Sequence, residues 1–469
     1  MTSGLAALEA EARRQLALYD YPPRDWVLHR ADADGPVPDV VIVGAGQNGI
    51  ALAVALIREK IRSFVLLDQS PPGREGPWMT YARMRTLRTI KELTGPDAGL
   101  PALAFPTWFQ AQFGDAAWRD LVRIPKGMWM DYLDWLRRFL ALPVVNEARI
   151  VDIAPEGALV VATTRDGRRF RGRRVVLATG IDGYGEKRVP AEMAHLPRHL
   201  WAHSADDIDF AALAGRRVAV LGAGASAFDN AATALEAGAA GVGLFIRRPA
   251  IPGVNSTRWL EFAGLMRNFP ELDDAHRWRF MRRIFALPVP PPQHSVERCT
   301  AHANFTLHLA SPWLEARVEP GGGAGVRTPC GWQAFDFLIA ATGFSVDPGQ
   351  RPELARLAAD GARWADRYRP PPGEEQPAIA VHPYLGRWFE FQPRRPGTDD
   401  WVERVFAYGV AALPSMGPIC AGINGMPYGV QRLAHGISRS FFLEDADRYH
   451  QAFMAFDEQE LKQPAAQAG

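Results

Sequence analysis

The sequence predicts an α/β fold built on two Rossmann-like units, the second inserted in the chain of the first. Two observations carry this prediction: a strand, a glycine-rich turn and a helix at VVIVGAGQNGIALAVAL, and a second copy of the same pattern at VAVLGAGASAFDNAATAL. An uninterrupted apolar run suits a strand that is buried on both faces. The glycines let the chain turn sharply and let a helix pack closely on that strand. We therefore expect two parallel sheets covered by helices.

The first copy has the full pattern of a dinucleotide-binding unit. Residues 40–43 form the strand, residues 49–60 the helix, and residues 64–67 a second strand that ends at Asp68. A carboxylate at this distance from the glycines binds a ribose hydroxyl, while the helix N-terminus receives the pyrophosphate. A glycine-rich turn without a ligand is the alternative. The predicted contacts of this first dinucleotide are Gly44, Gly46, Gly49, Asp68 and Gln69.

The second copy ends differently, and the difference predicts a different ligand. Its strands occupy residues 218–221 and 242–246, and Arg247 and Arg248 follow where the first copy has Asp68. An acid suits a free ribose, whereas an arginine suits a 2′-phosphate. We therefore expect one FAD-like and one NADP-like site in the same chain. The predicted contacts of the second dinucleotide are Gly222, Gly224, Ser226, Ala227, Arg247 and Arg248, with Ala227 in the place of the third glycine.

The bulk composition is that of an ordinary globular protein. The chain has 469 residues, of which 47% are hydrophobic and 22% charged, and its formal net charge is +1. This balance gives no reason to expect binding to nucleic acid or to a membrane surface. No apolar run is long enough to span a membrane, and the charged N-terminal helix lacks the apolar core of a secretory signal.

The three cysteines, Cys299, Cys330 and Cys420, are far apart in the sequence and none forms a CxxC pair. This usage argues for a reducing compartment, so we expect a cytoplasmic protein. It also argues against a disulfide reductase, the main other class of protein with two dinucleotide folds. The histidines near Cys299 lack a fourth ligand at metal-site spacing, so no metal is expected.

In chain order, the segments indicate a discontinuous domain organisation. Two buried strands that end in Ala-Thr-Gly, at residues 174–180 and 335–344, are the expected crossing points between domains. Thr179, Gly180, Thr342 and Gly343 at their ends are predicted cofactor contacts. The expected parts are an N-terminal helix and lead-in at 1–37, an FAD domain at 38–185 plus 345–469, and an NADP domain at 186–344 with an irregular insertion at 249–312.

The remaining segments have expectations of their own. A loop rich in proline and glycine at 71–78 is expected to pass over the flavin side of the first site and to place Trp78 there. The cationic stretch at 79–93 faces cofactor phosphates or an anionic substrate, or it is a solvated basic surface. Glycines around Asn424 suggest backbone lying close to a ligand. Helices are expected at 106–113, 128–140, 273–285 and 432–443, and an antiparallel excursion at 144–170.

The order of these parts resembles the class B flavin monooxygenases, which include flavin-containing, N-hydroxylating and Baeyer–Villiger monooxygenases. The residues that carry the resemblance are the two glycine turns with Asp68 and Arg247, Trp78, and the two Thr-Gly pairs at the crossing points. His203-Ser204 stands where the family fingerprint has a His-Ser pair, whereas Pro197, His199 and Asp207 depart from that fingerprint.

The resemblance implies FAD in the first domain and NADPH in the second. It further implies that NADPH reduces the flavin, that a C4a-hydroperoxide forms with O2, and that a small-molecule substrate is oxygenated, at an amine nitrogen or another heteroatom. The cofactor does this chemistry, while the protein binds, orients and excludes water. This explains why no metal cluster or nucleophile-base set stands out in the sequence.

Two residues are candidate catalytic groups: His203 and Asn255, as contacts of the nicotinamide or of the flavin intermediate. A packed structural role is the alternative for His203. Two other functions stay open at this point. One is a dehydrogenase or oxidase of the same fold that transfers no oxygen atom, and the other is a non-catalytic FAD-binding redox protein. A homodimer is the assembly we allow for.

Overall fold

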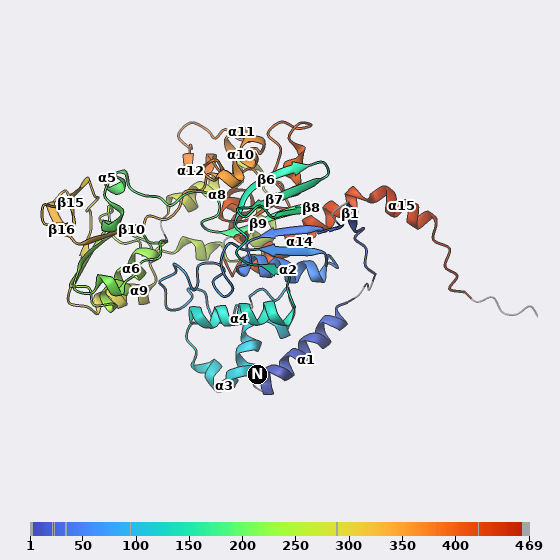
Figure 1. The fold of residues 1–469 in the computed structure, drawn as a ribbon, viewed down its shortest axis with the longest axis horizontal. Coiled ribbons are helices and arrows are strands. Elements are labelled where there is room, and N and C mark those ends of the chain that lie inside the picture. Colours follow the sequence, from blue (N-terminus) through green and yellow to red (C-terminus); the bar gives the residue numbers. More distant parts are fainter. Residues whose placement is uncertain are drawn as a thin grey trace, which may run out of the picture.

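The computed structural model describes residues 3–461, apart from residues 21, 23, 33, 34, 94, 288 and 421. Two five-stranded parallel sheets organise it, and the central strand of each leads into one glycine turn (Figure 1). The prediction of an α/β fold with two Rossmann-like units is therefore confirmed. The start of the 1–37 lead-in, Pro288 of the insertion and the end of the 345–469 segment lie outside the described residues.

The first sheet has the strand order β18-β9-β3-β4-β5. All four residues of its central strand are buried, as the apolar run predicts. Helix α2 begins at Gln47 instead of Gly49, because Gly46 directly precedes its first turn. The bounds are β3 (Val40–Val43), α2 (Gln47–Arg58), β4 (Phe64–Leu67), β5 (Val144–Val145), β9 (Arg174–Gly180) and β18 (Val405–Gly409).

Three helices pack against one another beside this sheet: α1 (Ser3–Leu18), α3 (Phe105–Asp120) and α4 (Lys126–Phe139). Helices α3 and α4 meet in an aromatic cluster in which Phe105 touches Trp108, Trp129 and Tyr132. These four rings are buried, and the Tyr132 hydroxyl donates to the Leu103 carbonyl at 2.6 Å. The helix at 128–140 is therefore part of the core.

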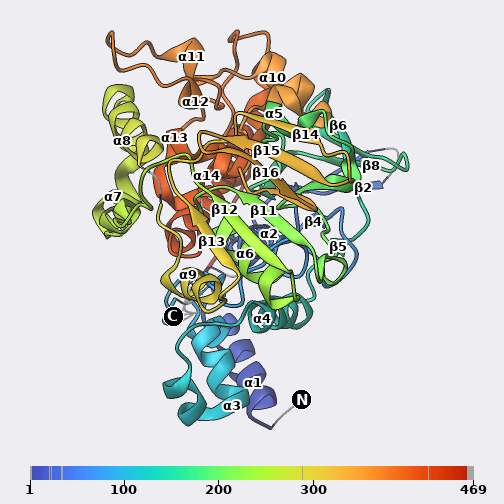
Figure 2. The ribbon, with the colours of Figure 1, turned by 90° about the vertical axis from the view of Figure 1, so that its left-hand side faces the viewer.

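The second sheet has the order β10-β17-β11-β12-β13 and faces the viewer in Figure 2. Helix α6 follows its central strand, as α2 does in the first sheet. The segment 249–312, expected to be irregular apart from a helix at 273–285, contains that helix as α8 and also contains α7, α9 and β13. The four-residue strand β13 was too short to be recognised from alternation. The bounds are β10 (Trp201–His203), β11 (Arg217–Leu221), α6 (Ala225–Glu236), β12 (Gly241–Phe245), α7 (Ala263–Asn268), α8 (Asp274–Ala286), α9 (Gln293–Thr300), β13 (Phe305–His308) and β17 (Phe337–Ala340).

Smaller antiparallel elements accompany both sheets. The excursion predicted at 144–170 forms a three-stranded sheet, and a similar sheet after β13 was not predicted. The N-terminal lead-in contributes a two-stranded ribbon. The bounds are β1 (Arg30–Asp32), β2 (Gly35–Val37), β6 (Ile150–Glu156), β7 (Leu159–Thr164), β8 (Arg169–Gly172), α5 (Ala191–Ala194), β14 (Glu315–Val318), β15 (Ala324–Thr328) and β16 (Gly331–Phe335).

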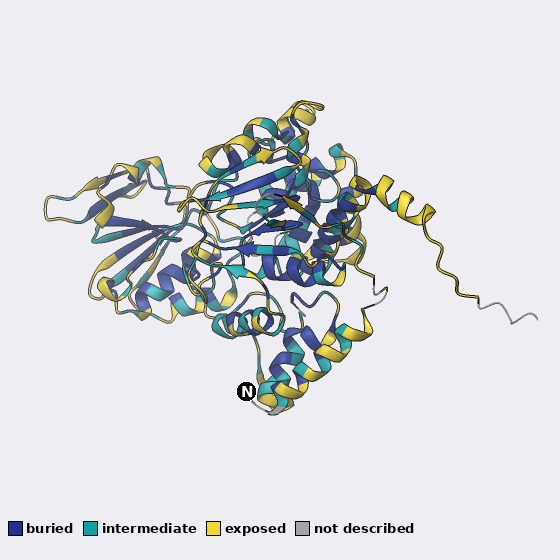
Figure 3. Cartoon of the chain, turned by 45° about the vertical axis from the view of Figure 1, so that its right-hand side comes forward, coloured by how far each residue is buried: buried dark blue, intermediate teal, exposed yellow. Residues whose placement is uncertain are grey.

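After β17 the chain returns to the first sheet, where β18 pairs in parallel with β9. Helix α14 (Met426–Glu444) packs on α2 and begins earlier than the predicted residue 432, since Pro427 suits a first helical turn. Helix α15 (Ala446–Met454) has no buried residue and extends from the body (Figure 3). Short helices lie between: α10 (Ala355–Asp360), α11 (Trp364–Arg367), α12 (Pro377–Ala380) and α13 (Leu413–Met416). Within the described ranges, no helix has the length and apolarity needed to cross a membrane.

Candidate functional site

The first glycine turn is tightly enclosed by backbone. Gly44 has φ 109°, and a Cβ at this position would lie 2.4 Å from the Ala178 carbonyl oxygen. A Cβ on Gly49, inside α2, would lie 1.9 Å from the Gly44 oxygen. Gly46 differs, because the nearest atom to its Cβ would be the Gly76 Cα at 3.7 Å. Two glycines are therefore required by the fold, while Gly46 leaves space at a helix N-terminus, where a phosphate is favoured.

Asp68 lies at the end of β4 and faces this turn. Its Oδ2 accepts the Ala45 N–H at 2.8 Å, and its Oδ1 accepts the Ser70 N–H at 2.8 Å. Burial raises the pKa of Asp68 despite these two donors. Each carboxylate oxygen can accept a second hydrogen bond, so a ribose hydroxyl can still be bound. Asp68 thus fixes the turn and keeps the capacity predicted for it.

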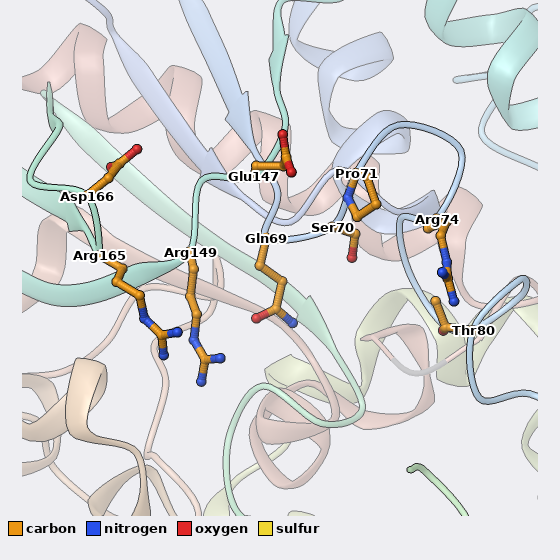
Figure 4. Close-up of a pocket in the computed structure, with 9 residues that line it drawn as sticks. All are labelled: Gln69, Ser70, Pro71, Arg74, Thr80, Glu147, Arg149, Arg165 and Asp166. Carbon is orange, nitrogen blue, oxygen red and sulfur yellow. The ribbon is translucent and has the colours of Figure 1, made fainter. Parts of the chain in front are cut away.

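A cavity of about 580 Å³ opens beside Asp68 (Figure 4). The side chains of Gln69, Arg149 and Arg165 point to the same side of it. The Arg165 N–H donates to the Arg149 carbonyl at 2.8 Å, which holds these two residues side by side. In this fold the adenosine of the dinucleotide follows the ribose that the acid binds. The cavity therefore suits the adenosine end of FAD. Its lining residues are Gln69, Ser70, Pro71, Arg74, Thr80, Glu147, Arg149, Arg165 and Asp166.

The loop at 71–78 passes over the first glycine turn, because Gly76 lies directly against Gly46. Trp78 follows in the same loop, and its indole Nε1 is buried without a hydrogen-bond partner among the described residues. A buried N–H donor of this kind is costly unless a ligand or water accepts from it. The spared space at Gly46 and the orphaned donor of Trp78 both fit an anionic dinucleotide such as FAD.

The second glycine turn repeats the first but is more open. Gly222 has φ 150°, and a Cβ there would lie 2.4 Å from the Ala341 carbonyl oxygen and 3.1 Å from the Ala227 methyl. Ala227 is fully buried, so a larger residue would push the helix away from the strand. Gly224 begins α6, and a Cβ there would meet nothing within 4 Å. Ser226 is exposed in the first turn of α6, where a pyrophosphate is expected.

Arg247 and Arg248 follow the end of β12. The side chain of Arg247 is exposed, whereas Arg248 is half-buried and its carbonyl accepts the Ala310 N–H at 2.8 Å. Among the described residues, neither guanidinium has a hydrogen-bond or ion-pair partner. Both cations are therefore available to a ligand at the edge of the second sheet.

Hydrogen bonds connect the chain just after the first crossing point to the second crossing point. The Gly343 carbonyl accepts the Arg188 N–H at 2.9 Å, and the Thr342 hydroxyl donates to the Arg188 carbonyl. At the first crossing, Thr179 and Gly180 end β9, and Gly180 pairs with Gly409 of β18. The structure thus brings the predicted Thr-Gly pairs to the region between the two sheets.

His203 ends β10 and is buried beside the second crossing point. Its Nε2 lies 3.0 Å from the Gly343 carbonyl oxygen, and its Nδ1 lies 3.1 Å from the Ala205 backbone nitrogen. Burial lowers the pKa of His203, which favours a neutral ring that donates through Nε2 and accepts through Nδ1. Because backbone groups engage both nitrogens, these contacts favour a positioning role. The catalytic role of His203 stays a prediction.

Asn255 and Glu261, the partner of Asn424, lie at the two ends of one short turn in the insertion. The Asn255 side chain accepts from the Thr257 N–H at 3.2 Å and from the Thr257 hydroxyl at 2.6 Å. Asn424 donates through Nδ2 to the Glu261 carboxylate at 2.7 Å. Asn424 therefore connects the C-terminal segment to the insertion, and its contact with a cofactor stays a prediction, as does that of Asn255.

Asp182 is a site residue that the sequence interpretation missed. Burial and the Asp182 carboxylate raise the pKa of Tyr81, which donates to that carboxylate. The Tyr81 ring also packs 6.3 Å from Phe344, centroid to centroid. This group joins the stretch at 79–93 to both crossing points. The signal was an acid two residues beyond Gly180, at the carboxyl end of a parallel strand, where ligands bind in such sheets.

Comparisons with known proteins agree with this architecture. A family model described as FAD-NAD(P)-binding matches residues 41–182. A second model, described as L-lysine 6-monooxygenase/L-ornithine 5-monooxygenase, matches residues 117–263. Together they cover the first glycine turn, the second glycine turn and the crossing between them.

Solved structures show the same fold at low sequence identity. An ornithine N-hydroxylase of Kutzneria sp. 744, with reduced FAD, NADP+ and L-ornithine, is 16% identical, with a TM-score of 0.66 over 86% of this chain and 100% of its own. L-lysine 6-monooxygenase of Pseudomonas syringae is 17% identical, with a TM-score of 0.65 over 86% and 99%. At these identities the likeness concerns the fold.

A full-length relative shows the family. The FAD-dependent urate hydroxylase of Xanthomonas campestris pv. campestris is 44% identical over 460 residues, which are 97% of this chain and 97% of that protein. The two turns, the cavity beside Asp68 and the family matches identify FAD and NADPH as the cofactors and the protein as an oxidoreductase. The chain therefore belongs to the family of FAD- and NADPH-dependent monooxygenases that contains this urate hydroxylase.

Proposed function

We propose that this monooxygenase oxygenates an anionic, nitrogen-rich ring compound of the urate type. The observation that carries the proposal is the 44% identity to a urate hydroxylase over nearly the whole of both chains. The cationic stretch at 79–93 supports it, because that stretch contacts the second crossing point and the segment after β10, although Arg85 and Arg88 in it are exposed. Tyr81 and Arg83 in it contact Phe344 and the Asp206 carbonyl.

Bound FAD, reduced by NADPH, supplies the oxygen-transfer chemistry in this family. The residues of this chain bind and orient. Asp68 and Gly46 hold the first dinucleotide, and Gly224 and Arg247 hold the second. His203 fixes the second crossing point through Gly343. Trp78 and Tyr81, whose side chains are half-buried, would cover the space between the sites and limit the access of water to the reacting atoms.

Oxygenation of an amine nitrogen is the second candidate, because the lysine/ornithine monooxygenase model matches residues 117–263. The two candidates differ in the substrate that stimulates NADPH use and in the atom that receives oxygen. Purified holoenzyme is incubated with NADPH, 18O2 and either urate or a panel of amines and amino acids. Label in a urate-derived product supports the proposal, and label in a hydroxylamine supports the alternative.

The same experiment tests whether oxygen is transferred at all. Hydrogen peroxide formed in step with NADPH oxidation, with no label in any product, would identify an oxidase and contradict the proposal. Failure of NADPH to bleach the flavin anaerobically would contradict an enzymatic role altogether.

We also propose the domain division 38–185 plus 345–469 for FAD and 186–344 for NADPH, with residues 1–37 as a lead-in. The return of β18 to the first sheet supports it. The cysteine usage supports a cytoplasmic location. We propose a homodimer as the assembly, and light scattering of the holoenzyme tests it by giving the mass of the particle in solution.

A further inference from the structure

We propose that Arg88, together with Arg83 and Lys126, binds the anionic part of the substrate where the stretch at 79–93 meets helices α6 and α9. This inference rests on the proposed function, because it assigns the residues that would recognise a urate-type anion. It does not involve the glycine turns or Arg247, which serve the two dinucleotides.

Backbone pairing gathers these cations at one place. Thr86 and Pro125 form an antiparallel bridge, the Leu87 N–H donates to the Ile124 carbonyl at 2.8 Å, and the Lys126 N–H donates to the Arg85 carbonyl at 3.1 Å. The stretch therefore runs beside the segment that enters α4. Arg83 and Arg88 come from one side of this pairing and Lys126 from the other.

The two acids on α6 that face this place already have partners. Asp229 accepts from the Ser295 hydroxyl at 2.7 Å and from Arg298 at 3.3 Å. Glu236 pairs with Arg298 at 2.8 Å and with Arg85 at 3.0 Å. Arg85 and Arg298 therefore take the direct contacts of these carboxylates, and Asp229 acts on Arg88 and Lys126 only through its charge, without a hydrogen bond.

Of the three proposed cations, Lys126 and Arg83 donate only to backbone carbonyls. Lys126 Nζ donates to the Ala82 carbonyl at 2.5 Å. Arg83 donates to the carbonyls of Thr80 at 2.7 Å and Asp206 at 3.3 Å. The Arg88 guanidinium has no hydrogen-bond or ion-pair partner in the described ranges, although Arg123 donates to the Arg88 carbonyl at 2.8 Å. Their charges are therefore not matched by hydrogen-bonded carboxylates.

The electrostatic setting agrees with an unmatched positive charge. Solvent reaches the Arg88 side chain, yet the surrounding protein lowers the pKa of its guanidinium. Burial and the nearby Arg83 lower the pKa of Lys126, and burial together with Arg123 lowers that of His294 on α9; the charge of Asp229 opposes both shifts without reversing them. An anion that entered this place would relieve the repulsion among these groups.

Four buried polar atoms of the same region lack partners among the described residues: Arg83 Nε, Thr89 Oγ1, Asn230 Oδ1 and His294 Nε2. They include both donors and acceptors, and each costs free energy unless a ligand or water satisfies it. A flat ring that carries negative charge, N–H donors and carbonyl acceptors would complement this set. A urate-type anion has these groups, whereas an aliphatic amine does not.

The test uses the full-length holoenzyme and urate as the probe. Arg88→Ala should weaken urate binding, measured by calorimetry, and raise the urate KM by about 10- to 150-fold, the value of one charge-assisted contact. Arg88→Lys, which keeps the charge but loses the two-pronged geometry, should weaken binding less. The matched control is Arg85→Ala, because Arg85 lies on the same stretch but pairs with Glu236. It should leave urate binding unchanged.

Each outcome separates the site from the proposed function. Unchanged urate affinity in a folded Arg88→Ala variant with full flavin content would overturn the site. A raised NADPH KM with unchanged urate KM would also overturn it and assign the cations to the coenzyme phosphates. A third outcome is that wild type binds urate without incorporating oxygen, and that Arg88→Ala loses this binding. The binding site would then be confirmed, and the proposed function would be contradicted.

Discussion

Arg247→Ala is expected to change the coenzyme preference of the enzyme. Arg247 lies just past β12, where the adenosine ribose of a dinucleotide is bound in this fold, and its exposed guanidinium has no partner among the described residues. Removing it therefore breaks no protein contact, so the loss should be confined to the ligand. One charge-assisted contact contributes about 1.5–3 kcal/mol, which corresponds to about 10- to 150-fold in affinity.

The assay compares the KM values for NADPH and NADH of the holoenzyme with saturating substrate and oxygen. The KM for NADPH should rise by that factor. The KM for NADH, which has a bare 2′-hydroxyl, should stay almost unchanged. Arg248→Ala is the comparison: neighbouring residues in extended chain face opposite sides, so this variant should raise the NADPH KM less than Arg247→Ala does. Equal loss for both coenzymes, or a wild-type preference for NADH, would refute the assignment of the 2′-phosphate to Arg247.

Three further outcomes are expected. Gly46→Val should leave a folded protein, because a Cβ at this position meets no atom closer than 3.7 Å. It should abolish FAD binding, because the valine side chain would occupy the space of the pyrophosphate. Full flavin absorbance in that variant would contradict the first site. Arg149→Ala and Arg165→Ala should weaken FAD binding to the apoprotein by about 2- to 30-fold, from loss of about 0.5–2 kcal/mol of cation–π contact. They should spare FMN, which lacks adenosine, and Arg169→Ala is the control on the same small sheet. Glu444→Gln should lower the Tm. Burial raises the pKa of Glu444, but Arg174 at 2.6 Å, together with Arg173 and Arg30, outweighs burial and holds that pKa below its ordinary 4.5. The contribution is fully present above pH 4.5 and is lost on acidification, so the Tm difference from wild type should shrink as the pH falls below 4.5. A difference independent of pH would contradict the ion pair.

The parts of the fold that follow from local pattern were predictable. Residues 40–43 and 218–221 are short apolar runs, and the glycines after them are required by close backbone approach at Gly44 and Gly222. Asp68 was identifiable because its distance from the glycines is set by the length of one helix and one strand. Such features depend on neighbours in sequence, so the sequence alone reveals them.

The parts that depend on distant contacts were not predictable. Strand β13 exists because β12 offers it an edge, and its four residues carry no pattern of their own. Asp182 was missed because its partner Tyr81 is far away in sequence. The sequence predicts a catalytic role for His203 from its place beside a motif, but it does not reveal that backbone groups engage both of its ring nitrogens. Only the assembled crossing points reveal that engagement.

The two glycine turns differ in how far they are covered, and this difference matches the two roles in the reaction. At the first turn, Gly76 lies against Gly46, Trp78 follows in the same loop, and Asp68 bonds to the turn itself. At the second, a Cβ on Gly224 would meet nothing within 4 Å, and Arg247 is exposed. A covered site favours a cofactor that stays bound, because release requires a loop to move. An open site favours a coenzyme that must enter and leave in each cycle. The same local motif thus serves a resident FAD and an exchanging NADPH through the segments that pack on it.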